Sequence, residues 1–303
     1  MNGRFAQDFE FSSDLKSPSQ SVWMVIPVFN RREITLGCLE HLHAIGVMGW
    51  CQVVVADGGS SDGTVQAIRT RFPEVTVLEG RWWWMEGIRA GMEHAQNQGA
   101  DMYVWLNDDC RPTAGSVEAL VDRAHTTGHV CGGVTRSPLG AYAGMRKTSF
   151  GLRPLDVSAL KPGEVLPVDS LVGNFVAWPG KVVAATGLPD AVVFPHLCAD
   201  HYYTLEAGRH GFPRELVGGV EAEDVHPDMG WARQSILRGD QPVGFVARWL
   251  LQWNPRAGLL PELRLHRRFW GPAGVLIPLG PWLKKWLLLS LRIVLPKALR
   301  SRL

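Results

Sequence analysis

The chain has 303 residues and a formal net charge of +2, so it can bury the core of one large domain or two modest ones and shows no sign of a nucleic-acid partner. Its five cysteines are odd in number and form no Cys-x-x-Cys pair, which argues against a disulfide framework and favours the cytoplasm. Residues 1–20 are polar and lack the apolar core of a signal peptide, so we expect them to form a loose leader.

The first half of the chain alternates strand and helix patterns. A continuous apolar run at 22–28 predicts a strand that is covered on both faces. Further apolar runs predict strands at 51–56, 75–78 and 103–106, and the segments between them carry apolar residues at helical spacing. This β-α-β-α-β order predicts an α/β fold with a mostly parallel sheet, right-handed crossovers and flanking helices.

Polar side chains follow three of these strands at their carboxyl ends. Asn30 comes after the first strand, Asp57 after the second, and Asp108 with Asp109 after the fourth. Open α/β sheets bind their ligands at this edge. Adjacent carboxylates repel unless a cation lies nearby, and Mg²⁺ or Mn²⁺ carrying a diphosphate is a common solution. The alternative is a polar turn, because Asn-Asp-Asp also suits a turn.

The phosphate-binding motifs of other nucleotide enzymes are missing from the sequence. There is no GxxxxGK[ST] motif, and no GxGxxG follows the first strand, which excludes a P-loop ATPase and a dinucleotide dehydrogenase. An acid-lined cleft can still bind a nucleoside diphosphate through a metal ion, with Asp57 accepting hydrogen bonds from the base or ribose. This combination indicates an enzyme that uses a nucleotide sugar.

Five segments resemble the motifs of family 2 glycosyltransferases with the GT-A fold. Val-Ile-Pro-Val-Phe-Asn at 25–30, Val-Ala-Asp-Gly-Gly-Ser-Ser-Asp-Gly-Thr at 55–64 and Leu-Asn-Asp-Asp at 106–109 are similar to the three opening motifs. Arg-Trp-Trp-Trp at 81–84 resembles a segment of bacterial surface-polysaccharide, rhamnosyltransferase-like members. Gly-Asn-Phe at 173–175, with the run from Phe194 to Tyr203, resembles the acceptor-side motifs. The resemblance runs from about residue 22 to residue 226, and it implies a GT-A type nucleotide-diphospho-sugar transferase fold.

The resemblance also implies roles for individual residues on the donor side. Asn107 takes the first position of the DxD motif and Asp109 the third, so Asp109 is expected to contact Mg²⁺ or Mn²⁺. Asp108 is expected to face the ribose or the donor sugar. An amide in the first position departs from the family pattern and leaves the metal fewer anionic ligands. The residues expected to hold the base and ribose are Pro27, Phe29, Asn30 and Asp57.

The segment around the three tryptophans leaves two alternatives open. Arg89 stands where relatives usually carry Asn, and it could pair with the diphosphate or be a solvated helix residue. Three successive tryptophans cannot all face one core, so Trp82 or Trp83 is expected to line the cleft. Trp84 fits the apolar face of the following helix.

Two residues further along the chain are candidates for the chemistry. Inverting transfer needs a base that takes the proton of the acceptor hydroxyl, and the resemblance assigns that role to Asp200. A helix N-cap is the other role open to Asp200. His226 stands where some relatives place a further metal ligand, and the alternative is a surface or capping histidine.

The last part of the chain differs in charge from the rest. Ten Lys and Arg residues stand against one acid from position 256 onward, so this part carries +9 and the preceding part −7. The apolar run at 282–295 spans 14 residues, shorter than the ~20 needed to cross a bilayer. Tryptophan beside lysine on a leucine-rich helix favours the surface of an anionic membrane. The alternative is a helix packed on the catalytic domain or on a partner subunit.

These observations predict a leader at 1–20, a GT-A catalytic domain at 21–240 and a basic amphipathic helical tail at 241–303. The expected function is inverting transfer of a sugar from a nucleotide-sugar donor to a glycan acceptor, lipid-linked, in cell-surface polysaccharide biosynthesis. The expected location is the cytoplasmic face of the cell membrane. The alternatives are a sugar-phosphate nucleotidyltransferase, which would want a glycine-rich basic loop after the first strand, and a non-catalytic membrane-bound scaffold.

Overall fold

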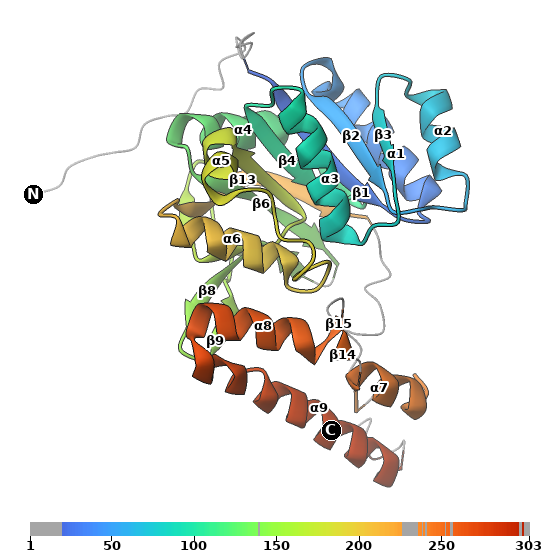
Figure 1. Cartoon of the computed structure of the whole chain (residues 1–303), viewed down its shortest axis with the longest axis vertical. Helices are drawn as coiled ribbons and strands as arrows, with labels where there is room; N and C mark the ends of the chain where they lie inside the picture. The colour runs from blue at the N-terminus through green and yellow to red at the C-terminus, as the bar shows by residue number, and fades with distance from the viewer. Residues whose placement is uncertain are drawn as a thin grey trace, which may run out of the picture.

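A computed structural model describes residues 20–138, 140–225, 236–237, 239, 241–251, 253–254, 257–296 and 299 (Figure 1). In this part of the chain a ten-stranded sheet has the order β10-β13-β6-β12-β4-β1-β2-β3, with β5 and β7 paired at its side. The four predicted strands are parallel neighbours, which confirms the α/β fold. Their bounds are β1 (Val22–Val28), β2 (Gln52–Asp57), β3 (Thr76–Glu79) and β4 (Met102–Leu106).

Helices cover both faces of this sheet. Successive residues of a strand point to opposite faces, so Met24 and Ile26 pack with α1, α2 and α4, whereas Trp23 and Val25 pack with α3, α5 and α6. All seven residues of β1 are buried, as its continuous apolar run predicts. The helices are α1 (Arg32–Ala44), α2 (Thr64–Arg71), α3 (Trp84–Asn97), α4 (Ser116–Thr127), α5 (Gly180–Thr186) and α6 (Ala199–Arg209), with a 3₁₀ turn η1 (Val47–Gly49).

The second half of the sheet contains mixed strand directions. β12 runs antiparallel to β4 and β6, and β13 runs parallel to β6. The strands are β5 (Cys110–Pro112), β6 (Val130–Ser137), β7 (Gly140–Tyr142), β10 (Val165–Val168), β12 (Phe175–Pro179) and β13 (Arg214–Asp224). A separate small sheet holds β8 (Gly144–Thr148), β9 (Gly151–Pro154) and β11 (Ser170–Leu171).

The C-terminal segment forms a helical layer beside α6 and the small sheet (Figure 1). It contains α7 (Val243–Leu250), β14 (Trp253–Asn254), β15 (Ala257–Gly258), α8 (Leu259–Trp270), η3 (Pro272–Leu276) and α9 (Leu279–Val294). Trp270 Nε1 donates to the carbonyl of Thr148 at 2.6 Å, and Lys147 Nζ donates to the carbonyl of Phe269 at 2.6 Å. Arg268 pairs with Glu206 of α6 at 3.1 Å. Within the described residues, none of the helices has the length and hydropathy that a bilayer crossing requires.

All five cysteines are free thiols inside the fold. Cys38, Cys51, Cys110 and Cys131 are buried, and Cys198 is partly buried. Burial disfavours the charged thiolate, so it raises the pKa of each thiol, that of Cys38 to about 12.

Candidate active site

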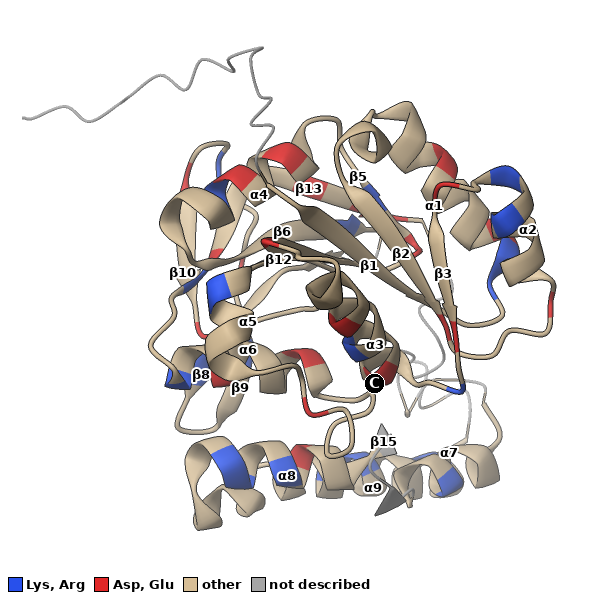
Figure 2. Ribbon diagram, turned by 45° about the horizontal axis from the view of Figure 1, so that its top comes forward, with Lys and Arg blue, Asp and Glu red and all other residues tan. Residues whose placement is uncertain are grey.

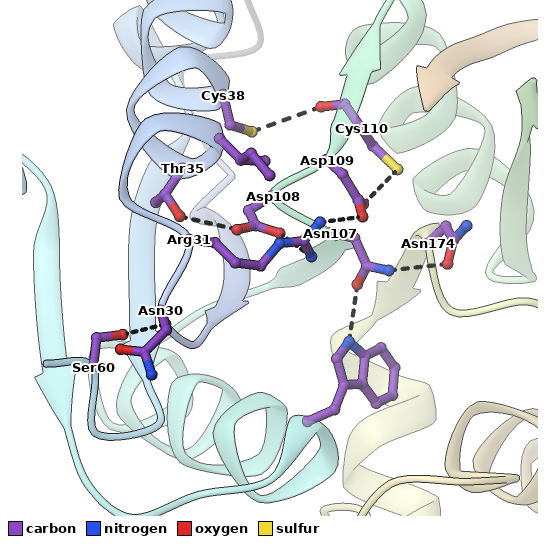
Figure 3. Close-up of polar contacts among 12 residues, drawn as sticks. Asn30, Arg31, Thr35, Cys38, Ser60, Asn107, Asp108, Asp109, Cys110 and Asn174 are labelled. Carbon is purple, nitrogen blue, oxygen red and sulfur yellow. Dashed lines mark hydrogen bonds and ion pairs between the residues drawn. The ribbon is translucent and has the colours of Figure 1, made fainter. Parts of the chain in front are cut away.

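The loops after β1, β2 and β4 meet at one edge of the sheet, as the sequence predicts (Figure 3). The backbone N–H of Asn30 donates to Ser60 Oγ at 2.7 Å, and the N–H of Ser61 donates to Asn30 Oδ1 at 2.8 Å. Asn30 has a φ of +52°, a left-handed conformation that Asn tolerates better than most residues. These bonds join the first loop to the second.

Asp57 is a buried carboxylate, and only one of its two oxygens accepts hydrogen bonds from the described residues. Its Oδ1 accepts the N–H groups of Gly59 at 2.9 Å and Ser60 at 2.7 Å. Its Oδ2 is buried and has no hydrogen-bond partner among the described residues. A buried acceptor without a donor is costly, so this oxygen suits a donor supplied by a ligand, such as the N–H of a base or a ribose hydroxyl.

Arg31 lies between the two acids that follow β4 (Figure 3). Its Nη1 is 2.9 Å from Asp108 Oδ1, and its Nη2 is 2.8 Å from Asp109 Oδ2. The hydroxyl of Thr35 donates to Asp108 Oδ2 at 2.9 Å. The sequence predicts a metal ion beside these carboxylates, but the cation that contacts them here is Arg31, the residue directly after Asn30.

Asp108 does not face an open cleft, which differs from the expectation that it faces the ribose or the donor sugar. Only 1% of Asp108 is exposed, and Arg31 and Thr35 hold its two carboxylate oxygens. Burial raises the pKa of Asp108 to about 6 and outweighs the opposing effect of Arg31. Asp108 therefore joins the loop after β4 to Arg31 and Thr35 through buried contacts.

The amide of Asn107 is oriented by two hydrogen bonds. Trp84 Nε1 donates to Asn107 Oδ1 at 2.9 Å, and Asn107 Nδ2 donates to Asn174 Oδ1 at 3.0 Å. Because an indole nitrogen only donates, the amide oxygen must face Trp84 and the amide nitrogen must face Asn174. A carboxylate at position 107 would require the Asn174 amide to turn and donate from its nitrogen. The amide at position 107 fits the network as it stands.

Of the two acids that follow β4, Asp109 is the more accessible, with 18% of its side chain exposed against 2% for Asp108. The described residues contain no cluster of three or more His, Cys, Asp and Glu that could hold a metal. A carboxylate oxygen such as that of Asp109 is a ligand type that Mg²⁺ and Mn²⁺ prefer, so Asp109 could contribute one ligand to such an ion. The second metal candidate, His226, lies outside the described residues. Val225 precedes it and donates its N–H to the carbonyl of Asp109 at 2.9 Å.

A pocket of about 560 Å³ lies beside Asp200, the candidate base. Asp200 belongs to the first turn of α6, and 21% of its side chain is exposed. Its Oδ2 accepts the N–H of Gly173 at 3.0 Å. A Cβ at Gly173 would lie 2.9 Å from the Cβ of Asp200 and 2.6 Å from Trp84, so the close approach requires glycine. The N-cap of α6 is Cys198, which makes the N-cap alternative for Asp200 wrong.

A second pocket, of about 520 Å³, lies on the side of β1 and β2 and is lined by Pro27, Phe29 and Trp83 among others. Both volumes are typical of sites for small ligands. Trp84 and His196 line both pockets and so stand where the two meet. Burial lowers the pKa of His196, which keeps its ring neutral near pH 7.

Trp84 packs against the buried core on the α3 side of the sheet, as expected, and it also lines both pockets. The expectation for Arg89 changes. Arg89 donates from Nη1 to the carbonyl of Pro189 at 2.9 Å, so it anchors the loop before α6. Arg89 is not among the described residues that line either pocket. Helical spacing could not reveal the contact between Arg89 and Pro189, because the two residues lie 100 positions apart in the sequence.

Comparison with known proteins agrees with this architecture. Residues 23–171, just under half of the chain, match the model of the family described as glycosyl transferase family 2. None of the curated protein sequences compared with the chain matches it. The mostly parallel sheet flanked by helices is the GT-A fold, which is shared by the similar solved structures.

Three of these structures illustrate the likeness. GalNAc-T7 with UDP, GalNAc and Mn²⁺ has a TM-score of 0.56 and 12% identity, covering 68% of this chain and 44% of that chain. The mannosyltransferase PcManGT from Pyrobaculum calidifontis, in complex with GDP-Man and Mn²⁺, has a TM-score of 0.53 and 17% identity, covering 91% and 86%. TarS 1–349 of S. aureus in complex with UDP-GlcNAc has a TM-score of 0.50 and 13% identity, covering 67% and 58%. This chain thus spans less than half the length of the first.

Proposed function

We propose that this protein is an inverting, metal-dependent glycosyltransferase that moves a hexosyl or deoxyhexosyl group from a nucleotide sugar to a glycan acceptor. The observation that carries the proposal is the pair of pockets that meet at Trp84 and His196. Asp57 and Asp109 belong to the edge beside one pocket, and Asp200 lines the other. The solved structures with UDP, GDP-Man and UDP-GlcNAc support a nucleotide-sugar donor.

In this proposal each side chain has a distinct role. The base and ribose lie against Pro27 and Phe29, and Asp57 Oδ2 accepts a hydrogen bond from them. Asp109 would hold Mg²⁺ or Mn²⁺, which when bound neutralises charge on the diphosphate leaving group. Asn107, fixed by Trp84 and Asn174, lines the acceptor pocket at the junction with the donor.

Asp200 supplies the proton transfer that an inverting reaction needs. Its carboxylate takes the proton of the acceptor hydroxyl while the oxygen attacks the anomeric carbon from the side opposite the leaving group. The N–H of Gly173 donates to Oδ2 of this carboxylate at 3.0 Å and the N–H of His201 to Oδ1 at 2.7 Å, and the side chain stays 21% exposed and lines the pocket. A neutral His196 nearby adds no charge that would oppose the transfer.

The proposal includes a lipid-linked acceptor in cell-surface polysaccharide biosynthesis and a position on the cytoplasmic face of the membrane. Basic residues lie along α8 and α9 (Figure 2). The outward face of α9 exposes apolar side chains, with Leu287 61% and Val294 78% exposed. An apolar helix face flanked by lysines suits the interface of an anionic membrane.

A panel of nucleotide sugars tests the donor half of the proposal. We expect one of them to raise the melting temperature of the protein in the presence of Mn²⁺ and to be hydrolysed slowly without an acceptor. Binding to the native state stabilises the protein by mass action, so the shift should grow with donor concentration. If no nucleotide sugar shifts the melting temperature or is hydrolysed, the protein is a scaffold with the fold of a transferase.

A further inference from the structure

The hydrogen bonds of Asn107 fix the orientation of a second amide, that of Asn174. Trp84 Nε1 can only donate, so the amide oxygen of Asn107 lies toward it at 2.9 Å. The amide nitrogen of Asn107 then donates to Asn174 Oδ1 at 3.0 Å. The oxygen of Asn174 is thereby occupied, and its nitrogen lies at the end of the amide that points away from Asn107 (Figure 3).

The amide nitrogen of Asn174 is a donor that the protein does not use. Nδ2 carries two hydrogens, and the described part of the chain offers it no hydrogen-bond partner. The side chain of Asn174 is partly buried and lines the pocket beside Asp200, and Nδ2 itself stays accessible. The pocket therefore holds an N–H donor of fixed orientation that a ligand can use.

The backbone holds Asn174 close to the candidate base. Gly173 directly precedes Asn174, and its N–H donates to Asp200 Oδ2 at 3.0 Å. A Cβ at position 173 would lie 2.9 Å from the Cβ of Asp200, so the two segments pack tightly. Because consecutive Cα atoms are only ~3.8 Å apart, the side chains of Asn174 and Asp200 can both reach one sugar ring.

Two hydroxyl groups on adjacent carbons of a sugar match this pair of side chains. In the proposed reaction Asp200 takes the proton of the attacking hydroxyl. The oxygen of the neighbouring hydroxyl can accept a hydrogen bond from Asn174 Nδ2. A vicinal diol thus satisfies both groups at once, and the second contact orients the oxygen that attacks.

We infer that Asn174 is a specificity-determining residue that selects an acceptor sugar with a vicinal diol. Its Nδ2 donates to the hydroxyl oxygen next to the one that Asp200 deprotonates. Trp84 and Asn107 act through Asn174 as positioning residues, because they decide which end of its amide is free. This inference rests on the proposed function, since the pocket beside Asp200 must be the acceptor site.

A comparison of acceptors tests the inference. The donor is the nucleotide sugar that raises the melting temperature, and the acceptors are methyl glycosides of the common hexoses. Each accepted glycoside is compared with the analogues that lack one hydroxyl next to the glycosylated position. We expect one deoxy analogue to have a kcat/KM about fivefold lower than its parent, as for the loss of one neutral hydrogen bond.

Two results of this comparison would overturn the inference. One is an equal kcat/KM for the parent and its deoxy analogues. The other is the failure of every methyl glycoside to accept sugar from a donor that is hydrolysed, because a single ring with a vicinal diol would then not be recognised.

Asn174→Ala separates recognition from structural support. Loss of the bond to Asn107 affects all acceptors alike, whereas loss of Nδ2 affects only the parent, so the ratio of parent to deoxy analogue should fall to about one. Asn97→Ala at the exposed end of α3 is the matched control and should keep the ratio of the unaltered protein. The same ratio in Asn174→Ala as in the control would overturn the inference.

Asn174→Asp is a second variant that still offers Asn107 an acceptor. Its carboxylate can accept from the neighbouring hydroxyl but repels a fluorine in that place, whereas the amide N–H can face fluorine. Replacing the hydroxyl by fluorine should therefore lower kcat/KM about threefold more in Asn174→Asp than in the unaltered protein. Equal effects of fluorine in the two proteins would overturn the assignment of an N–H donor.

The donor measurements on the unaltered protein separate this inference from the proposed function. A melting shift and donor hydrolysis, together with no discrimination against the deoxy analogues, overturn the role of Asn174 and leave the proposed transferase standing. Absence of both the melting shift and donor hydrolysis overturns the proposed function, and the pocket beside Asp200 is then no acceptor site.

Discussion

Asp109 Oδ2 lies 2.8 Å from Nη2 of Arg31, so the candidate metal ligand already has a positive partner within the protein. The same guanidinium contacts Asp108 at 2.9 Å and lowers the repulsion between two adjacent carboxylates. A metal ion held by Asp109 would share this carboxylate with Arg31. Arg31 also lines the donor pocket, which places it within the same site.

Asp109→Asn should weaken the binding of Mn²⁺ and remove most of the donor hydrolysis. Loss of an outer partner of a metal costs about 10- to 100-fold in affinity, and loss of a direct ligand should cost at least as much. Asp109 is not deeply buried, so the melting temperature should change little. Titration of Mn²⁺ in the presence of donor measures the effect, with Asp122→Asn on the exposed side of α4 as control. Equal Mn²⁺ affinity in both variants would contradict the role of Asp109.

Asp108 should make the stability of the protein depend on pH between about 4 and 6. The pKa of Asp108 rises from 3.8 to about 6 in the folded protein. The folded state therefore favours the protonated acid, and its contribution to the free energy of unfolding is largest below pH ~4 and is lost as the pH rises to about 6. Asp108→Asn should remove this slope. Melting temperatures of both proteins across this range test it, and parallel curves would contradict it.

Asp200→Asn should lower kcat by about 10²- to 10⁴-fold, as expected for loss of a general base. The amide oxygen can still accept one of the two backbone N–H groups that donate to Asp200, those of Gly173 and His201, so the loss of stability should be small and the donor affinity should be preserved. Steady-state kinetics and donor titration separate the two effects. A collapse of donor affinity instead would show that Asp200 contacts the donor or supports the structure.

Trp84→Phe should lower kcat/KM about fivefold or more, because Asn107 loses a partly buried hydrogen bond worth about 1 kcal/mol and is no longer held in its orientation. The effect should appear for both donor and acceptor, since Trp84 lines both pockets. Trp83→Phe retains an aromatic ring at the neighbouring, more exposed position and should change kcat/KM less than threefold. Similar losses in the two variants would contradict a special role for the Trp84 indole nitrogen.

Replacing Leu283 and Leu287 together by Gln should weaken binding to anionic vesicles. Each exposed leucine that leaves the interface removes apolar burial worth about 1.5–3 kcal/mol at most, and the remaining attraction of Lys284 and Lys285 is screened by salt. Co-sedimentation measures the effect, with Val165→Gln on β10 as a matched exposed apolar control. Equal binding of the double variant and the control would mean that α9 does not meet the membrane.

Features that depend on local sequence were predictable. The apolar runs of β1 and its neighbouring strands predict the parallel sheet. The polar residues at the ends of these strands predict the edge where Asn30, Asp57 and Asp109 lie. The period of a strand and the rule that ligands bind at strand ends are enough for this.

Features that depend on contacts between distant residues were not predictable. Arg31 contacts Asp109, which lies 78 positions along the chain, and the Asn107 amide donates to Asn174, 67 positions along the chain. The docking of α8 uses the backbone carbonyls of Thr148 and Phe269. Every residue carries such a carbonyl, so no residue type marks the contact in the sequence.

The buried thiols make the chain well suited to site-selective labelling. The thiolate is the reactive form of cysteine, and the raised thiol pKa values keep all five native cysteines protonated near neutral pH. A cysteine introduced on the exposed face of α9, as in Leu287→Cys, would therefore react with a maleimide dye ahead of the native thiols. A polarity-sensitive dye at that position can then report contact between α9 and a lipid surface without a cysteine-free background.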